Sequence, residues 1–304
     1  MALTSLLDLP APAKLNLFLH ITGRRADGYH LLQSIFVLID WADTIQLERR
    51  TDGRLQRHDL GPALPADDLS LRAARALQAA SGCTLGADIS VMKRVPWGAG
   101  MGGGSSDAAT VLLGLNRLWG LGWPRARLLE LAAPLGADVP FFVGGENALV
   151  EGIGERLTPI AWTPRLYAVV KPAESLATAG IFSHPDLARD TKPATLEGSF
   201  ADMNGDFGPL FGHNDLQPVA EALCPAIALV ADWLKDRYGN SRMTGSGSAV
   251  FAEVGRRADS ATVCERGGAG EPPVAAWPEG ALPEGWVGRL CRGLAHHPLR
   301  DWAG

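Results

Sequence analysis

The sequence is poor in the features that mark secreted, membrane-spanning and nucleic-acid-binding proteins. Its four cysteines are far apart and form no C-x-x-C pair, so neither a disulfide framework nor a zinc site is expected. It has no run of about 18 apolar residues to span a membrane, and its first residues lack the basic start of a secretory signal. Lysine and arginine (28) are outnumbered by aspartate and glutamate (33), whereas polyanion-binding proteins carry a basic excess. We therefore expect a cytoplasmic protein with reduced thiols and with no membrane or nucleic acid polymer among its partners.

The rest of the composition is that of a globular protein rich in glycine. Of the 304 residues, 46% are hydrophobic and 20% are charged, which excludes a wholly disordered chain. Domains usually contain roughly 100–200 residues, so the length favours two domains, with one large domain as the alternative. Glycine accounts for 36 residues, and no collagen-like period explains this number. The useful question is therefore where the glycines gather.

Local patterns predict a mixture of strands and helices. Residues 13–21 alternate in polarity, which is typical of a half-buried strand, and the period of two puts Lys14 and Asn16 on the same face. Helical spacing predicts helices at 69–80 after Asp67-Asp68, at 105–119, at 125–135 and at 214–237. Further strands are expected at 30–47, as one or two strands, and at 89–95, 147–157, 166–170 and 248–254.

The glycines gather in residues 96–107, with the sequence PWGAGMGGGSSD. A predicted strand precedes this loop and a predicted helix follows it, so backbone N–H groups are exposed at a helix N-terminus. Glycine lets the backbone approach a ligand closely, and the positive end of the helix favours an anion such as phosphate. A merely flexible surface loop is disfavoured, because such loops need one or two glycines and this one has five within residues 98–104.

The loop matches neither of the two common nucleotide-binding motifs in full. Gly98, Gly100 and Gly103 satisfy G-x-G-x-x-G, but no acidic residue follows about 20 positions later at the end of a second strand. The chain contains no Gly-Lys pair, which excludes a P-loop. The sequence therefore predicts a phosphate-binding loop of a third kind.

This loop resembles the ATP-binding motif of the GHMP kinases, such as galactokinase, homoserine kinase and mevalonate kinase. Three further blocks narrow the resemblance to the 4-diphosphocytidyl-2-C-methyl-D-erythritol kinases of the non-mevalonate isoprenoid pathway, in the same order along the chain. The blocks are PAKLNL (12–17) with DGYH (27–30), GADVPFF (136–142) and RMTGSG (242–247). The chain departs from this family at 255–282, where the family continues with helix.

The resemblance implies a two-domain α+β GHMP kinase fold. Its N-terminal half would resemble domain 2 of ribosomal protein S5, and its C-terminal half would be α/β. Residues 1–158 would form the ATP-binding domain and 159–304 the substrate domain, with 255–285 irregular.

The implied reaction is ATP-dependent phosphorylation of the 2-hydroxyl of 4-diphosphocytidyl-2-C-methyl-D-erythritol, with ATP as co-substrate and Mg²⁺ present. The alternatives are another small-molecule GHMP kinase, of the homoserine or mevalonate type, and a non-catalytic nucleotide-binding protein on the same fold. The sequence predicts no oligomeric state.

Two residues are the candidates for catalysis. From the residues alone, Asp138 is equally a functional carboxylate or a turn-capping one, and Lys14 is either paired or a strand-edge lysine that reaches water. The resemblance implies that Asp138 is the catalytic base, which orients the acceptor hydroxyl and takes its proton late. It places Lys14 beside Asp138 and Asn16 near the substrate.

The resemblance also assigns the binding residues. Tyr29 and Phe182 would stack on the two faces of the cytosine ring, His30 would hydrogen-bond to its edge, and Thr178 would lie near the substrate. Residues 245–248 would close the site, with an ordinary turn as the alternative. The ATP-binding residues would be Pro96, Trp97, Gly98, Ala99, Gly100, Met101, Gly102, Gly103, Gly104, Ser105 and Ser106. Ser106 is also a candidate contact for Mg²⁺, and N-capping of the following helix is the simpler role for both serines.

Overall fold

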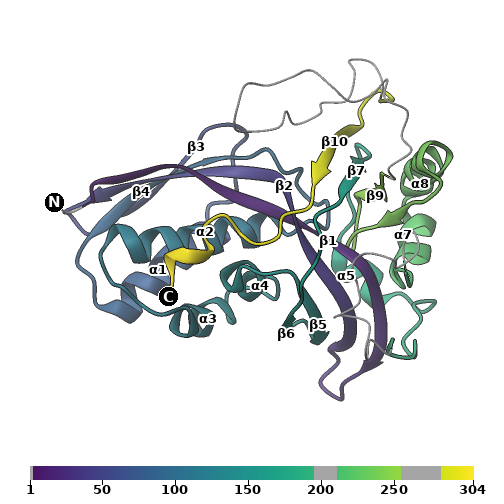
Figure 1. The fold of residues 1–304 in the computed structure, drawn as a ribbon, viewed down its shortest axis with the longest axis horizontal. Coiled ribbons are helices and arrows are strands. Elements are labelled where there is room, and N and C mark those ends of the chain that lie inside the picture. The colour runs from purple at the N-terminus through teal and green to yellow at the C-terminus, as the bar shows by residue number, and fades with distance from the viewer. Residues whose placement is uncertain (1–2, 195–210, 255–281) are drawn as a thin grey trace.

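The computed structural model describes residues 3–194, 211–254 and 282–304, and it contains two β-sheets connected by a long two-stranded ribbon (Figure 1). The larger sheet has the strand order β3-β4-β2-β5-β6, with β1 paired to β2, and the smaller sheet has the order β10-β7-β9-β8. The strands are β1 (Ser5–Arg24), β2 (His30–Arg50), β3 (Leu55–Asp59), β4 (Gly86–Met92), β5 (Ala148–Gly152), β6 (Arg156–Pro159), β7 (Leu166–Lys171), β8 (Arg242–Met243), β9 (Val250–Glu253) and β10 (Val287–Arg292).

Helices cover both sheets, as Figure 1 shows. Those of the first half are α1 (Leu69–Ser81), α2 (Gly103–Leu118), α3 (Arg125–Ala132) and α4 (Val139–Gly144). Those of the second half are α5 (Thr178–Ser183), α7 (Gln217–Leu223) and α8 (Pro225–Tyr238), and a short 3-10 helix, η1, spans Arg300–Trp302.

The ribbon formed by β1 and β2 belongs to both halves of the molecule. The sequence predicts a half-buried strand at 13–21, and this is wrong: Lys14 and Phe18 are 3% and 1% exposed, although they lie on the face expected to meet solvent. Phe18 shares a hydrophobic cluster with Tyr167 and Phe251 of the smaller sheet. That sheet covers the second face of the ribbon, and this long-range packing leaves no trace in the local pattern.

Helix α2 is the central helix of the first half, and nearly every residue from Ser106 to Leu118 is buried. It begins two residues earlier than predicted. Its N-cap is Gly102, in a left-handed conformation with φ of 70°, and no side chain caps it. The expectation that Ser105 and Ser106 cap this helix is therefore wrong. The N–H groups at this end are left without a side-chain acceptor, as an anion site requires.

Other elements follow the predictions with local differences. Helix α1 begins where expected, because the Asp68 carboxylate accepts hydrogen bonds from the backbone N–H groups of Ser70 and Leu71. The predicted helix at 214–237 is broken into α7 and α8. Pro225 has no N–H to continue α7, but it fits the first turn of a new helix.

The predicted strand at 147–157 is also divided, into β5 and β6. Gly152, the last residue of β5, and Gly154, in the turn that follows, adopt positive φ, which ends the extended conformation. The expected strand at 30–47 is the single long strand β2. The segment expected to be irregular, 255–285, falls mostly outside the described residues.

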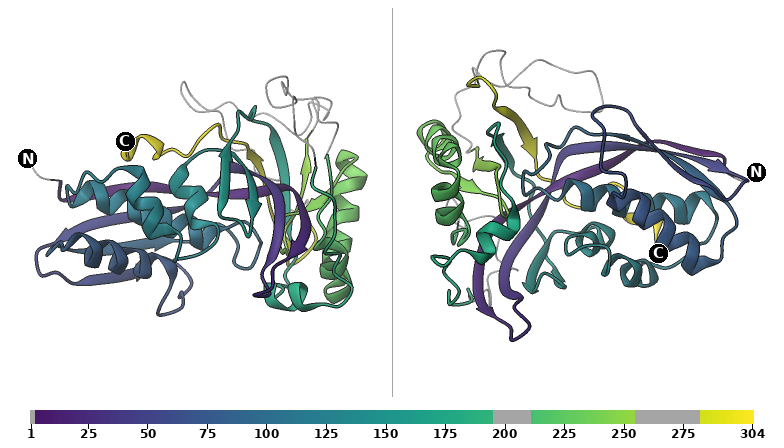
Figure 2. Two further views of the ribbon diagram at one scale, coloured as in Figure 1. Left: turned by 90° about the horizontal axis from the view of Figure 1, so that it is seen from below. Right: turned by 180° about the vertical axis from the view of Figure 1, so that it is seen from behind.

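The chain returns to the first half after β10, as Figure 2 shows. Isolated bridges pair Gly293 with Ile39 and His296 with Glu146. The guanidinium of Arg125 then holds the segment against α4. It donates to the carbonyl oxygens of Val143, Gly144, Arg300 and Ala303.

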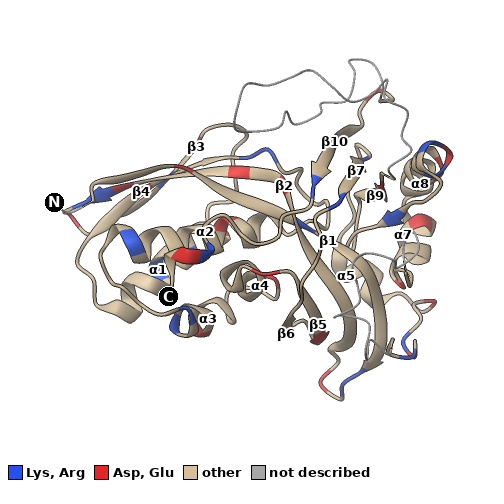
Figure 3. Cartoon of the chain, in the orientation of Figure 1, with Lys and Arg blue, Asp and Glu red and all other residues tan. Residues whose placement is uncertain are grey.

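Lys and Arg residues are interspersed with Asp and Glu residues along the helices and strands, as Figure 3 shows. Within the described ranges, no helix has the length and apolar character needed to cross a bilayer. Cys83, Cys224 and Cys291 are free thiols, and Cys264 lies outside the described residues.

Candidate active site

A cavity of about 730 Å³ lies between the two halves, where the ribbon meets loops from both. Its lining comes from β1, the turn between β1 and β2, the glycine loop, the turn before α4, α5 and the loop at 245–247. Ten residues assigned from the sequence line it: Lys14, Asn16, Tyr29, His30, Gly98, Gly100, Gly102, Asp138, Thr178 and Phe182. The fold thus gathers candidates for catalysis, ATP binding and base binding around one space.

Lys14 and Asp138 form an ion pair in this cavity. Lys14 Nζ lies 3.7 Å from Asp138 Oδ2, and the two side chains are 4% and 29% exposed. Burial lowers the pKa of Lys14, and the charge of Asp138 opposes that shift. Asp138 precedes α4, yet its side chain makes no capping hydrogen bond. The geometry therefore favours a carboxylate directed at the cavity over a capping one.

The Lys14 ammonium is fixed by two further neighbours. It donates to Oδ1 of Asn16 and lies 4.6 Å from the centroid of the Phe36 ring. Lys14 and Asn16 share a strand face as predicted, which brings the two side chains together. A lysine so surrounded has little rotational freedom, so its charge is held at one point in the cavity.

Asn16 links the ribbon to the second half. Its backbone N–H donates to Oγ1 of Thr244 at 2.9 Å, and its side-chain amide donates to Ser34 Oγ at 3.1 Å. The Thr244 hydroxyl in turn donates to Asn16 Oδ1 at 3.3 Å. Because every polar atom of the Asn16 side chain is engaged, its orientation is fixed.

The glycine loop packs on the loop at 244–249. Gly98, Gly100 and Gly102 all adopt positive φ, between 64° and 72°. A Cβ on Gly100 would lie 2.3 Å from the carbonyl oxygen of Thr244, so only glycine fits there. The N–H of Ser248 donates to the carbonyl of Gly98 at 3.0 Å. The loop is thus held in a hydrogen-bonded frame, which contradicts the alternative of a merely flexible loop.

A buried charge cluster, formed by Lys93, Asp43 and Asp107, lies next to the glycine loop. Lys93 Nζ contacts the carboxylates of both Asp43 and Asp107, the latter in α2 at 2.6 Å. Asp43 also accepts from the backbone N–H groups of Arg94 and Val95, which lead into the loop. Burial lowers the pKa of Lys93, but the two carboxylates outweigh it and raise the pKa above its ordinary value.

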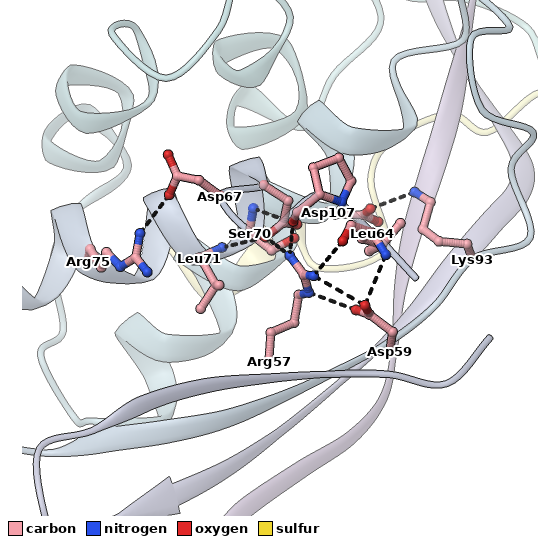
Figure 4. Close-up of polar contacts among 11 residues, drawn as sticks. Arg57, Asp59, Leu64, Asp67, Ser70, Leu71, Arg75, Lys93 and Asp107 are labelled. Carbon is pink, nitrogen blue, oxygen red and sulfur yellow. Dashed lines mark hydrogen bonds and ion pairs between the residues drawn. The ribbon is translucent and has the colours of Figure 1, made fainter. Parts of the chain in front are cut away.

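A second polar network lies close to this cluster, as Figure 4 shows. Arg57 of β3 contacts Asp59 at 2.7 Å and Asp68, the cap of α1, at 2.6 Å. These ion pairs tie β3 to the start of α1. Together with the ion pairs of Lys93, they hold the segments around the glycine loop in place.

The other end of the cavity is aromatic. The His30 and Phe182 rings lie 5.1 Å apart between centroids, and Tyr29 is 61% exposed. Thr178 Oγ1 is 2.7 Å from Ser246 Oγ, so α5 meets the loop at 245–247 across the cavity. Tyr29, His30 and Phe182 all line this cavity, and such aromatic rings are suited to bind a planar base by stacking.

Comparisons with known proteins show the family of the chain. The GHMP kinases N-terminal domain matches residues 68–146, and the GHMP kinases C-terminal domain matches residues 194–269. A 4-diphosphocytidyl-2-C-methyl-D-erythritol kinase from Methylibium petroleiphilum is 61% identical over 305 aligned residues, covering 100% of both chains. The chain belongs to the 4-diphosphocytidyl-2-C-methyl-D-erythritol kinases, within the GHMP kinases.

Solved structures support the fold of this family. A crystal structure of 4-(cytidine 5'-diphospho)-2C-methyl-D-erythritol kinase is similar with a TM-score of 0.69 and 35% identity, covering 82% of this chain and 89% of that one. A homoserine kinase from Cytophaga hutchinsonii is similar with a TM-score of 0.63 but only 18% identity, covering 82% and 85%. The predicted two-domain α+β GHMP kinase fold is thus confirmed, and the homoserine kinase shares the fold alone.

Eight assigned residues of this family member lie outside the cavity lining. Ala99, Met101 and Ser106 are buried, at 3%, 1% and 0% exposure, whereas Trp97 is 64% exposed. The full set is Pro96, Trp97, Ala99, Met101, Gly103, Gly104, Ser105 and Ser106. Their assignment to ATP stays a prediction. Buried Ala99 and Met101 can act only through backbone groups or by shaping the loop, because their side chains carry no group that binds phosphate.

Sequence reasoning missed four residues that shape the site. Phe36 lies under the Lys14 ammonium, Ser34 and Thr244 fix Asn16, and Arg189 donates to His30. Thr244 lies within the RMTGSG block, but the block alone indicates no role for its side chain. The other three carried no local signal, because their partners are distant in sequence.

Proposed function

We propose that the protein transfers the γ-phosphoryl group of ATP to the 2-hydroxyl of 4-diphosphocytidyl-2-C-methyl-D-erythritol, a step in non-mevalonate synthesis of isoprenoid precursors. One observation carries this proposal. A single cavity has the Lys14–Asp138 pair and the glycine loop on one side and the aromatic pocket of Tyr29 and Phe182 on another. Phosphoryl transfer needs a phosphate site and a positioned hydroxyl, and the cytidyl group needs a planar slot.

Asp138 and Lys14 are assigned to the acceptor hydroxyl. An alcohol is far less acidic than a carboxylic acid, so Asp138 orients the hydroxyl and accepts its proton late, as the bond to phosphorus forms. Lys14 is held within 3.7 Å of Asp138 and offsets the negative charge that develops there. Asn16, fixed by Ser34 and Thr244, adds a polar contact to the same acceptor end.

The glycine loop is assigned to the ATP phosphates. Gly98, Gly100 and Gly102 line the cavity, and the uncapped start of α2 directs N–H groups and the positive helix end toward an anion. A family kinase uses ATP as co-substrate, and Mg²⁺ is part of the proposal. The buried Ser106 hydroxyl has no hydrogen-bond partner in the described part of the chain, which suits an oxygen ligand of Mg²⁺. Bound Mg²⁺ would neutralise phosphate charge during transfer.

Tyr29, His30, Phe182 and Thr178 are assigned to the cytidyl substrate. The aromatic rings provide stacking, and His30 provides a hydrogen bond to the base edge. We also retain the division into an ATP-binding domain, 1–158, and a substrate domain, 159–304. The two separate sheets support this division, although residues from 293 onward pack on the first half.

An ATP-consumption assay tests the proposal. The purified protein is incubated with ATP, Mg²⁺ and one of three acceptors: the cytidyl substrate, homoserine or mevalonate. We expect turnover with the cytidyl substrate and none above background with the other two. Turnover with homoserine or mevalonate alone would overturn the substrate assignment and leave the fold intact. ATP binding without turnover on any acceptor would contradict the kinase activity itself.

A further inference from the structure

We propose that Arg189 is a positioning residue for base selection: it fixes the tautomer of His30, so that the pocket prefers cytosine to uracil. This inference rests on the proposed function, because it concerns the base end of the same cavity. Arg189 lies outside every block that carries the family resemblance, and it does not line the cavity. Its effect on the base therefore passes through His30.

The guanidinium of Arg189 is held rigidly by the turn that follows α5. It donates to the carbonyl oxygens of His184 at 2.7 Å, Leu187 at 2.9 Å and Phe182 at 3.2 Å. Its Nε donates to Nε2 of His30 at 3.1 Å. The Arg189 side chain thus contacts both residues whose rings line this end of the pocket: it binds the backbone of Phe182 and the imidazole of His30.

This contact determines which ring nitrogen of His30 carries the proton. A nitrogen that accepts a hydrogen bond from Arg189 has no proton of its own, so a neutral imidazole here has its proton on Nδ1. Burial, the charge of Arg189 and the charge of Arg24 at the end of β1 all lower the pKa of His30, which keeps the ring neutral. The nearby carboxylate of Asp27, on the turn between β1 and β2, forms its ion pair with Arg25, at 2.7 Å, and not with His30.

Nδ1–H of His30 has no hydrogen-bond partner among the described residues, and His30 lines the cavity. It is therefore a donor available to a bound base. The O2–N3 edge of cytosine consists of two acceptors, whereas uracil has an N3–H donor beside O2. A fixed donor suits cytosine and meets a second donor in uracil, which leaves a polar group unpaired. An imidazole with its proton on Nε2 would lack this preference.

Two variants separate this role from a structural one. Arg189→Met removes the donor and keeps a side chain of similar length. Arg24→Met removes the other nearby charge, which makes no hydrogen bond to His30. We expect Arg189→Met to raise the KM of the cytidyl substrate about tenfold, the size of one lost hydrogen bond. The preference for the cytidyl substrate over its uridyl analogue should fall, while kcat and the KM of ATP are retained. Arg24→Met should keep the preference.

Nitrogen NMR of the imidazole tests the tautomer in the protein without any substrate. We expect the wild-type protein to have the His30 proton on Nδ1 and Arg189→Met to have a proton on Nε2. A wild-type His30 protonated on Nε2, or an unchanged cytidyl-to-uridyl preference in Arg189→Met, would overturn the inference. If the methionine variant does not fold, Arg189→Lys keeps the charge without the planar fork and should change both readouts in the same direction. The NMR result holds even if the proposed substrate fails in the assay, so the two failures are distinguishable.

Discussion

Lys14 Nζ and Asp138 Oδ2 lie 3.7 Å apart in the cavity, although one belongs to β1 and the other to the turn before α4. Lys14 is nearly inaccessible to solvent, and its pKa is lowered by burial, which the carboxylate opposes. An unpaired buried ammonium would be costly, so the carboxylate stabilises Lys14. In the proposed mechanism the same carboxylate accepts the proton of the acceptor hydroxyl. This arrangement gives the clearest test of the proposed mechanism.

We expect Asp138→Asn to lower kcat by about 10²- to 10⁴-fold, because the amide keeps the shape but cannot accept the proton. The KM values for both substrates should change little. The matched control is Asp232→Asn, on the exposed side of α8, which should retain wild-type kinetics. A kcat near the wild-type value in Asp138→Asn would reject the assignment and reopen the search for a base among the other acids.

Lys14→Met is expected to lower kcat as well, because it removes positive charge next to Asp138. Both residues act on one transition state, so their effects should not be additive. The double variant Lys14→Met/Asp138→Asn should be less impaired than the product of the two single losses. Steady-state kinetics of the four proteins give this coupling. Full additivity would indicate that the pair does not act together.

The phosphate-binding role proposed for the glycine loop is best tested at Gly104. A Cβ there meets only the Leu69 side chain at 3.9 Å, whereas a Cβ on Gly103 would crowd Val95 at 3.2 Å. We expect Gly104→Val to weaken ATP binding at least tenfold in calorimetry, since the side chain projects from the exposed start of α2. The melting temperature should be nearly unchanged. Gly61→Ala, whose added Cβ meets nothing within 4 Å, is the control. Unchanged ATP affinity would contradict the assignment.

Stacking on the base is tested at Tyr29, which is 61% exposed and so contributes little to the core. We expect Tyr29→Ala to weaken binding of the cytidyl substrate by roughly 1–3 kcal/mol, the usual value of stacking per base. The KM of ATP should not change, and Tyr29→Phe, which keeps the ring, should resemble wild type. An equal rise in both KM values would show that Tyr29 has a structural role. Phe182 packs against a buried hydrophobic cluster that includes Ile181 and Leu216, so Phe182→Ala should also lower the melting temperature.

We expect buried His297 to make the stability of the protein sensitive to acid. Burial, reinforced by Arg125, lowers the pKa of His297 from 6.5 to about 3, and its Nδ1 accepts from the N–H of Leu299 at 3.0 Å. Between pH 6.5 and pH 3, His297 is protonated in the unfolded chain but stays neutral in the folded chain. The contribution of His297 to the free energy of unfolding is therefore fully present above pH 6.5. It falls as the pH drops toward 3, by up to about 1.4 kcal/mol per pH unit.

Thermal unfolding between pH 7.5 and 4.5 measures this effect. In His297→Asn the amide oxygen replaces Nδ1 as acceptor and cannot titrate, so its melting temperature should fall less steeply with pH than that of the wild type. His296→Asn, at the exposed neighbouring position, should follow the wild-type slope. Parallel slopes for wild type and His297→Asn would disprove the assignment.

The sequence predicted features that depend on neighbours in the chain. The cap at Asp68, the glycine loop before α2 and the shared face of Lys14 and Asn16 all follow from local spacing. It could not predict that the second face of β1 is buried, because that burial is supplied by a sheet formed more than a hundred residues later. The same reason hid Arg189, whose partner His30 lies in the other half. The division at 158/159 stays a prediction.

The β1–β2 ribbon has a consequence for inhibitor discovery. Leu19 of β1 donates its N–H to His213 and accepts from the N–H of Asp215, so the second half is bonded directly to a strand of the first. Rotating one half against the other would break these bonds together with the packing of Phe18 on Tyr167 and Phe251. The cavity is therefore expected to keep its shape between the free and loaded protein. Compounds chosen to fit this cavity by rigid docking should fit it in solution, without allowance for domain closure.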